Sequence, residues 1–273
     1  MMRLLFLGPA WLWLLLFVAA PAVLLGVIAV ATGTETVPPY ALGFSLDNFA
    51  TLVADDYYLN GFLRSLEVAT VSAAVCLLIG YPMALAIARS APIRQPFLML
   101  LVMLPFWTGF LLRIAAWVGL LRDDGWINAA LLGVGLIAEP LPLLHTDFAM
   151  YIGIIYAYLP FMVLPLHARL SRADAALEQA ATDLGASPWR VFAAITLPLS
   201  LPGVWAGLVL VFVPVTGEFV IPDLLGGPSS QTMGRLIWNE FFGNHDWPLA
   251  ATLALVLLAV LLLPALLLRG RAT

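Results

Sequence analysis

Six long apolar stretches, separated by shorter polar segments, dominate the hydrophobic pattern of this 273-residue chain. A helix needs about 20 predominantly apolar residues to cross the hydrocarbon core of a bilayer, and each stretch is close to that length. The stretches cover residues 11–32, 62–88, 97–121, 148–166, 202–224 and 248–268. The pattern therefore predicts an all-α membrane protein with six transmembrane helices, which form a single transmembrane domain over residues 1–273.

Prolines lie inside all six stretches, which is unusual for helices of soluble proteins. A packed membrane bundle tolerates interior prolines because neighbouring groups satisfy the freed backbone carbonyls. The prolines are Pro21, Pro82, Pro105, Pro160, Pro214 and Pro264. Pro105 and Pro214 are candidates for helix breaks near a transport pathway, and kinks without function are the alternative.

Composition agrees with a membrane location. Hydrophobic residues make up 63% of the chain, charged residues 10%, and the mean hydropathy is +1.01, whereas soluble domains carry about 25% charged residues. We therefore expect membrane lipid, and no nucleic acid, around most of the chain. The one cysteine, Cys76, excludes an internal disulfide. The three histidines are far apart in sequence, so we predict no metal site.

The arginines predict how the chain is oriented. Arg3 precedes a first apolar run that is longer than the core of a cleavable signal peptide, so we expect a retained first span. In a six-span arrangement most arginines fall on one side, and positive loops stay in the cytoplasm. Both termini are therefore expected in the cytoplasm. The arginines on that side are Arg3, Arg89, Arg94, Arg169, Arg172, Arg190, Arg269 and Arg271.

The longest cytoplasmic connection, residues 168–201, has well-specified local chemistry. Asp174 is a candidate N-cap for a helix over 175–184, and Gly185 suits the left-handed residue that ends a helix. Ser187 followed by Pro188 is typical of a second helix start. This second helix is expected to stop at Pro198. The segment therefore predicts two short helices joined at a sharp corner; a plain linker with a surface helix is the alternative.

This connection resembles the EAA loop of bacterial ABC import permeases, whose pattern is Glu-Ala-Ala, three residues, Gly, nine residues, Ile-x-Leu-Pro. The matching residues here are Gln179, Ala180, Ala181, Gly185, Ile195, Leu197 and Pro198. Gln179 replaces the usual glutamate and loses its charge, while Glu178 lies one position earlier. The resemblance implies that these residues, with Trp189, couple the permease to an ATPase through a helix-in-groove contact.

Other segments are similar to the spermidine/putrescine type of polyamine permease, specifically to the first of its two permease subunits. They are LPFWTGFLLRIAAWVGLL (104–121), GEFVIPDLLGGPSSQTMGRLIWNEFF (217–242) and NHDWPLA (244–250). This resemblance implies uptake of polyamines such as putrescine or spermidine across the bacterial inner membrane. It also implies a heterodimer with a second permease, two ATPase subunits and a periplasmic binding protein.

The same resemblance implies that this chain is not an enzyme and carries no cofactor of its own, because partner ATPases bind ATP and magnesium. The sequence agrees, since it has no GxxxxGK[ST] phosphate-binding loop. Alternatives are an ABC permease for another solute, of the iron, thiamine or opine type, and an ion-driven secondary transporter. The choice of polyamine, the identity of the partner subunits and the consequence of Gln179 stay open.

Ionisable residues within apolar spans are costly and usually face a protein interior or a water-filled path. Glu218 is the first candidate for contact with an ammonium group, and a structural ion pair with Arg113 is the alternative. Asp223 lies near the end of the same span. Aromatic residues provide candidate cation–π faces, with bundle packing as the alternative. They are Phe106, Trp107 and Trp117.

Overall fold

The computed structural model describes the backbone of residues 2–269, and the side chains of residues 8–262 except Ala175. Most of this length is helical, and close contacts divide the chain into two compact units. One unit contains residues 1–64 and 231–273, and the other contains residues 65–230. The long helix α4 (Asp56–Arg89) contributes residues to both units.

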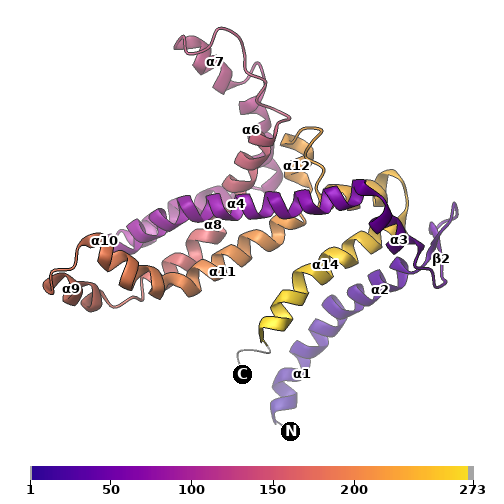
Figure 1. The fold of residues 1–273 in the computed structure, drawn as a ribbon, viewed down its shortest axis with the longest axis horizontal. Coiled ribbons are helices and arrows are strands. Elements are labelled where there is room, and N and C mark those ends of the chain that lie inside the picture. The colour runs from indigo at the N-terminus through magenta and orange to yellow at the C-terminus, as the bar shows by residue number, and fades with distance from the viewer. Residues whose placement is uncertain (1, 270–273) are drawn as a thin grey trace. The chain divides into compact units, whose positions relative to one another are not determined.

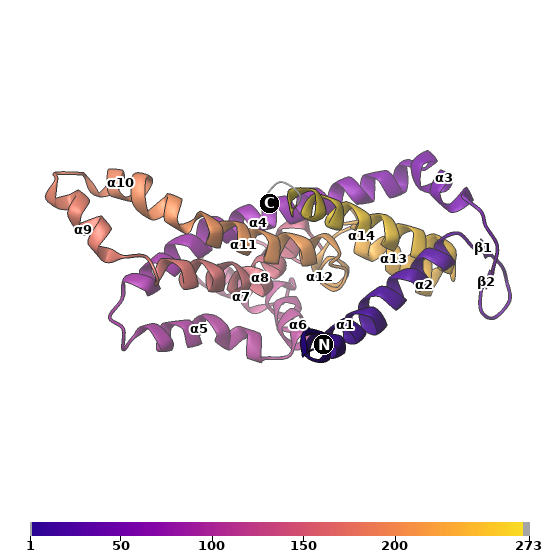
Figure 2. The same cartoon turned by 90° about the horizontal axis from the view of Figure 1, so that it is seen from below.

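The first unit pairs helices from the two ends of the chain, and α2 lies beside α14 (Figures 1 and 2). Thr252 of α14 donates a 3.1 Å hydrogen bond to the carbonyl of Ala29 in α2. The side-chain amide of Asn48 also donates to this carbonyl, at 3.0 Å. Besides part of α4, the unit contains α1 (Met2–Leu14), η1 (Leu15–Ala19), α2 (Ala20–Ala29), β1 (Thr32–Gly33), β2 (Tyr40–Ala41), α3 (Asp47–Ala54), α13 (Met233–Trp238), η3 (Asn239–Gly243) and α14 (Trp247–Arg269). The two short strands pair antiparallel.

The second unit is built on α8 and α11, which lie side by side in both views (Figures 1 and 2). Their close approach depends on glycine, because a Cβ atom at Gly203 of α11 would lie 2.9 Å from the backbone carbonyl oxygen of Pro165 in α8. Small residues allow such close contact between membrane helices. The unit contains the rest of α4 with α5 (Gln95–Trp107), α6 (Phe110–Leu121), α7 (Trp126–Gly133), α8 (Asp147–Leu170), α9 (Ala175–Asp183), α10 (Pro188–Val191), η2 (Phe192–Thr196), α11 (Leu197–Thr216) and α12 (Val220–Leu225).

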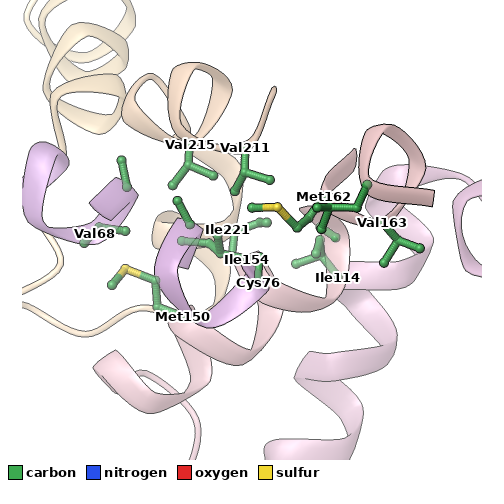
Figure 3. Close-up of a cluster of buried hydrophobic side chains, with 14 of the residues drawn as sticks. Val68, Cys76, Ile114, Met150, Ile154, Met162, Val163, Val211, Val215 and Ile221 are labelled. Atoms are coloured by element: carbon green, nitrogen blue, oxygen red, sulfur yellow. The ribbon is translucent and has the colours of Figure 1, made fainter. Parts of the chain in front are cut away.

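The core of this unit consists of apolar side chains from α4, α6, α8, α11 and α12 (Figure 3). Ile114, Met150, Ile154 and Ile221 are fully excluded from solvent. Outside this cluster, many large apolar side chains of the long helices are exposed. Lipid is the natural solvent for such exposed apolar surface.

Four helical segments in the described part of the chain are long and apolar enough to span a bilayer. They are Gly8–Ala29, Asp56–Arg89, Asp147–Leu170 and Pro188–Thr216. A fifth candidate consists of Gln95–Trp107 and Phe110–Gly133, which meet at an 85° bend. Trp247–Leu262 forms a shorter apolar helix.

The third predicted helix, 97–121, is interrupted at Thr108 and Gly109. Both residues have extended backbone conformations, with ψ angles of 145° and 139°. The hydroxyl of Thr108 donates a 2.7 Å hydrogen bond to the carbonyl of Pro105. This bond satisfies a carbonyl that the interrupted helix no longer pairs, as side chains commonly do at helix ends.

The boundaries predicted for the fifth helix, 202–224, and the predicted stop at Pro198 are wrong. The helix runs without a break from Pro188 to Thr216, through α10, η2 and α11. A π-helical turn, η2, lies immediately before Pro198. Such a turn changes the local hydrogen-bonding pattern and lets a proline ring fit within a continuing helix. The helix ends at Gly217, and α12 begins only at Val220.

The short apolar helix α7 ends at Gly133, and Gly135 beyond it adopts a φ of 73°. The expected orientation uses Arg3, Arg269 and Arg271. The side chains of Arg3 and Arg269, and all of Arg271, lie outside the residues that the structure describes.

Candidate functional site

The connection over 168–201 contains the predicted short helix α9 and the predicted corner at Gly185, but the second helix is the start of the long segment Pro188–Thr216 and not a short one. A side-chain oxygen of Asp174 accepts a 2.9 Å hydrogen bond from the amide of Ala176, which caps α9. Gly185 follows α9 with a φ of 82°, a left-handed conformation that favours glycine. Pro188 begins α10, whereas the Ser187 side chain makes no capping hydrogen bond. Both helices lie at one end of the α8–α11 pair (Figures 1 and 2).

Large apolar side chains of this corner face outward. Leu184 is 89% exposed, Trp189 is 74% exposed and Leu177 is 50% exposed. The ring of Trp189 stacks on Phe192, with a centroid distance of 5.4 Å. An exposed apolar group on a polar loop is typical of a protein interaction site.

The residues that match the family pattern differ in their surroundings. Gln179 and Ala180 on α9 are exposed, and Ala181 is half-buried. Ile195 is half-buried in η2, while Leu197 and Pro198 are exposed at the start of α11. The pattern therefore contains positions that face away from the protein and positions that pack on it.

Glu178 makes contacts that the sequence pattern does not predict. Its carboxylate accepts hydrogen bonds from Arg89 at 3.0 and 3.2 Å and from the hydroxyl of Thr196 at 2.6 Å. Arg89 ends α4, 89 positions away in sequence. Sequence analysis missed both partners, because neither Arg89 nor Thr196 belongs to the family pattern.

Glu218 lies in the break between α11 and α12 and is only 8% exposed. The hydroxyl of Tyr158, on α8, donates a 2.5 Å hydrogen bond to its Oε2 atom. Its Oε1 atom accepts a 3.0 Å hydrogen bond from the amide of Val220. The break thus supplies an amide at the start of α12, and α8 supplies a phenol. Tyr158 was not singled out from the sequence; its only signal was a hydroxyl-bearing ring within an apolar span.

Arg113 lies in α6 and is 7% exposed. Its guanidinium carbon lies 5.5 Å from the ring centroid of Phe106 and 5.7 Å from that of Phe110. Within the described part of the chain, its Nε and Nη1 atoms have no hydrogen-bond partner. The guanidinium therefore lies against aromatic rings, and the described residues show no ion pair between Arg113 and Glu218.

Two pockets flank Arg113. One, of about 420 Å³, is lined by Phe106, Trp107, Arg113, Tyr158 and Phe161, among others. The other, of about 470 Å³, includes Trp117 and Tyr156 in its wall. Three predicted pathway residues, Phe106, Trp107 and Arg113, therefore share one pocket. Glu218 is joined to that pocket through Tyr158.

The remaining candidates lie outside that pocket. Trp117 packs edge-on against Tyr156, with a centroid distance of 5.6 Å, and lines the second pocket. Asp223 is an exposed residue of α12. The geometry thus brings together a carboxylate, a phenol, a guanidinium and several rings, but neither Trp117 nor Asp223.

Comparisons with known proteins identify the family to which the chain belongs. A 36% identical relative is the spermidine/putrescine transport system permease protein PotB of Haemophilus influenzae, over 92% of this chain and 88% of the relative. PotB of Escherichia coli is also 36% identical, over 91% and 90%. The molybdenum transport system permease protein ModB of Mycobacterium bovis is 30% identical, over 93% and 91%.

Solved structures show the same fold. A bacterial ABC transporter involved in the import of the acidic polysaccharide alginate matches with a TM-score of 0.72, over 98% of this chain and 95% of that chain. Its sequence identity is 20%, so it supports the fold alone. The family model described as "binding-protein-dependent transport system inner membrane component" matches residues 9–269. This chain therefore belongs to that family of ABC importer permeases.

Proposed function

We propose that this chain is the transmembrane permease subunit of an ABC importer that moves polyamines, such as putrescine or spermidine, across the bacterial inner membrane. The observation that carries the proposal is the 36% identity with spermidine/putrescine permeases over 92% of this chain. The match spans both units and includes the coupling segment as well as the break at Glu218. A shared fold alone would not favour a polyamine, because permeases for other solutes share it.

The proposed membrane arrangement has six spans and both termini in the cytoplasm. Four single helices, the bent pair and α14 together supply the six. Arginine-rich connections then lie on the cytoplasmic side, as the positive-inside tendency favours. In this arrangement the α9–α10 corner also lies in the cytoplasm, where ATPases are found.

The pocket beside Arg113 has features that suit an alkylammonium ion passing along the permease. Aromatic faces attract such cations, with about 0.5–2 kcal/mol for a well-placed ring. Trp107 is 73% exposed in that pocket, whereas Phe106 is 41% exposed and contacts Arg113. Glu218, held by Tyr158 and the amide of Val220, is the carboxylate that we assign to an ammonium group of the cargo.

The exposed apolar residues of the corner suit a cytoplasmic partner. We assign them to a groove on an ATPase subunit, which a short helix enters with its apolar side chains. Leu184 and Trp189 are the central contacts, because they are the most exposed large apolar residues there. A second permease completes a heterodimer, two ATPases bind ATP and magnesium, and a periplasmic binding protein delivers the cargo. This chain itself performs no covalent chemistry.

The test is reconstitution of the complete complex in liposomes. A polyamine-loaded binding protein is expected to stimulate ATP hydrolysis and to drive uptake of labelled polyamine. Binding proteins loaded with iron, thiamine, an opine or molybdate serve as matched controls. Stimulation by one of these and not by polyamine would assign the permease to that solute instead.

A second arm separates an ATP-driven importer from an ion-driven transporter. Liposomes that contain both permeases without the ATPases are expected to show no uptake under an imposed proton or sodium gradient. Uptake under these conditions would contradict the proposal, because a secondary transporter needs no ATPase.

A further inference from the structure

One carboxylate connects three helical elements at the end of the second unit. Arg89, the last residue of α4, donates from Nη2 to both carboxylate oxygens of Glu178, at 3.2 and 3.0 Å. Thr196, the last residue of η2, donates to Oε1 of Glu178 at 2.6 Å. Since η2 leads directly into α11, Glu178 links α9 to the ends of both α4 and α11.

Apolar packing contributes little to the attachment of α9. Its large apolar residue Leu177 is 50% exposed, and Leu184, immediately after it, is 89% exposed. A pocket of about 360 Å³, lined in part by Arg89, Leu170, Glu178 and Thr196, lies beside the helix. The polar contacts of Glu178 therefore form the main connection between α9 and the ends of the long helices.

The hydrogen bond from Thr196 is unusual for a threonine in a helix. A helical threonine commonly donates to the carbonyl three or four residues before it, whereas this hydroxyl donates to a carboxylate 18 positions away. Thr196 is 2% exposed, and the 2.6 Å distance is typical of a charge-assisted hydrogen bond. Substitution of Glu178 would leave this buried hydroxyl without its carboxylate acceptor.

The ion pair with Arg89 has a different character. The side chains of Arg89 and Glu178 are 52% and 29% exposed, and ion pairs in contact with water add little to stability. Two donors from different helices nevertheless define where the carboxylate lies. The arrangement therefore suits a role in positioning α9 more than a role in stabilising the fold.

Glu178 and Gln179 are neighbours on α9 but face different surroundings. Successive residues of an α-helix point about 100° apart, so neighbours on α9 face different surroundings. Gln179, at the family position for glutamate, is exposed, while Glu178 is directed toward Arg89 and Thr196. The family pattern has a negative charge at position 179, which this chain lacks, and the chain carries that charge one position earlier, at Glu178, on the side that contacts the long helices.

We propose that Glu178 is a positioning residue that makes α9 move as one body with the ends of α4 and α11. This inference rests on the proposed function, in which an ATPase displaces α9. A displacement of α9 would then reach two membrane helices together, as rigid elements transmit motion between sites. Loss of the carboxylate is expected to leave the ATPase bound while less of its motion reaches the membrane.

The experiment uses the complete complex and the substitution Glu178→Gln, which keeps size and removes charge. Asp183→Asn is the matched control, since Asp183 is an exposed carboxylate of the same helix. We expect Glu178→Gln to co-purify with the ATPases and to hydrolyse ATP. Its uptake per ATP is expected to fall by about fivefold or more, the lower end of typical coupling between sites. The control is expected to match the wild type.

Two further variants separate a positioning role from a general loss of folding. The exchange Arg89→Glu with Glu178→Arg restores an opposite-charge pair and is expected to recover uptake per ATP above either single variant. Thr196→Val is expected to give a partial loss. Any one of three results would overturn the inference. The first is equal uptake per ATP in Glu178→Gln and the wild type, and the second is loss of ATPase attachment in Glu178→Gln. The third is uptake per ATP in the charge-exchanged double variant that is no higher than in the single variants.

A cargo-independent arm keeps this inference separate from the proposed function. Spin labels at Ala91→Cys and Ala176→Cys, in a Cys76→Ser background, report the distance between the α4 end and α9. We expect ATP binding to leave the distribution of this distance unchanged in the wild type and to broaden the distribution in Glu178→Gln. Identical distributions would contradict the inference whatever the cargo is, whereas failure of polyamine uptake by the wild type would contradict the proposed function alone.

Discussion

The hydroxyl of Tyr158 in α8 donates a 2.5 Å hydrogen bond to the carboxylate of Glu218, which follows α11. Glu218 lies where α11 has ended and α12 has not yet begun. Interrupted helices are a common way to build a transport site, because they bring backbone groups and ionisable side chains to one place within the membrane.

Glu218→Gln is expected to lower polyamine uptake by about tenfold or more, since a hydrogen bond to a charged group contributes about 1.5–3 kcal/mol. Tyr158→Phe keeps the carboxylate but removes its 2.5 Å donor, so a smaller loss is expected. Tyr57→Phe, an exposed tyrosine of α4, is the control. Uptake kinetics in proteoliposomes measure all three. Full activity of Glu218→Gln would exclude the carboxylate from cargo binding.

Arg113→Met is expected to keep or raise the melting temperature of the purified complex while polyamine uptake falls. A buried cation with unsatisfied donors is costly, and an apolar side chain of similar size is often neutral or stabilising in its place. Nε and Nη1 of Arg113 are such donors within the described residues. Thermal unfolding and uptake are measured on the same preparations.

The control for this substitution is Arg122→Met, because Arg122 is 60% exposed and pairs with Asp124. It is expected to change neither quantity measurably. A large loss of stability in Arg113→Met would show that the guanidinium holds the bundle together and does not serve the pathway.

Gly185→Ala is expected to weaken ATPase attachment, because a left-handed conformation costs a residue with a Cβ atom about 1–2 kcal/mol. The φ of Gly185 is 82°. Gly185→Asn is expected to restore attachment in part, since asparagine tolerates this conformation. The measurement is the fraction of ATPase that co-purifies with the permease.

Gly133→Ala is a suitable control, because Gly133 is a helical residue with open space around its Cβ position and no positive φ. It is expected to be neutral. Equal ATPase attachment in Gly185→Ala and Gly133→Ala would show that ATPase attachment does not depend on the corner at Gly185.

Trp189→Ala is expected to weaken ATPase binding by about thirtyfold, as tryptophan at the centre of an interface often contributes about 2 kcal/mol or more. Its 74% exposure means that the isolated permease loses little packing. Titration of labelled ATPase onto the permease in nanodiscs gives the affinity. Trp126→Ala, at an 80% exposed position of α7, is expected to bind the ATPase normally.

Local chemistry predicted the corner at residues 168–201 almost completely. Asp174 caps α9, Gly185 is left-handed and Pro188 begins α10, because each of these features depends on a residue and its immediate neighbours. The prediction that Pro198 stops the helix was wrong. The same helix also continues through Pro202 and Pro214, and a π-helical turn, which composition does not reveal, lies just before Pro198.

The sequence by itself determined the membrane location, the helical class and the family pattern of the corner, since these depend on composition, period and spacing along the chain. Only the tertiary structure decided which groups meet. It placed Tyr158 on Glu218, Arg113 on aromatic rings, and Glu178 between Arg89 and Thr196. The hydrogen-bonded pairs of Glu218 and Glu178 join positions 18 to 89 residues apart, and helix packing, which no local pattern encodes, brings them within hydrogen-bonding distance.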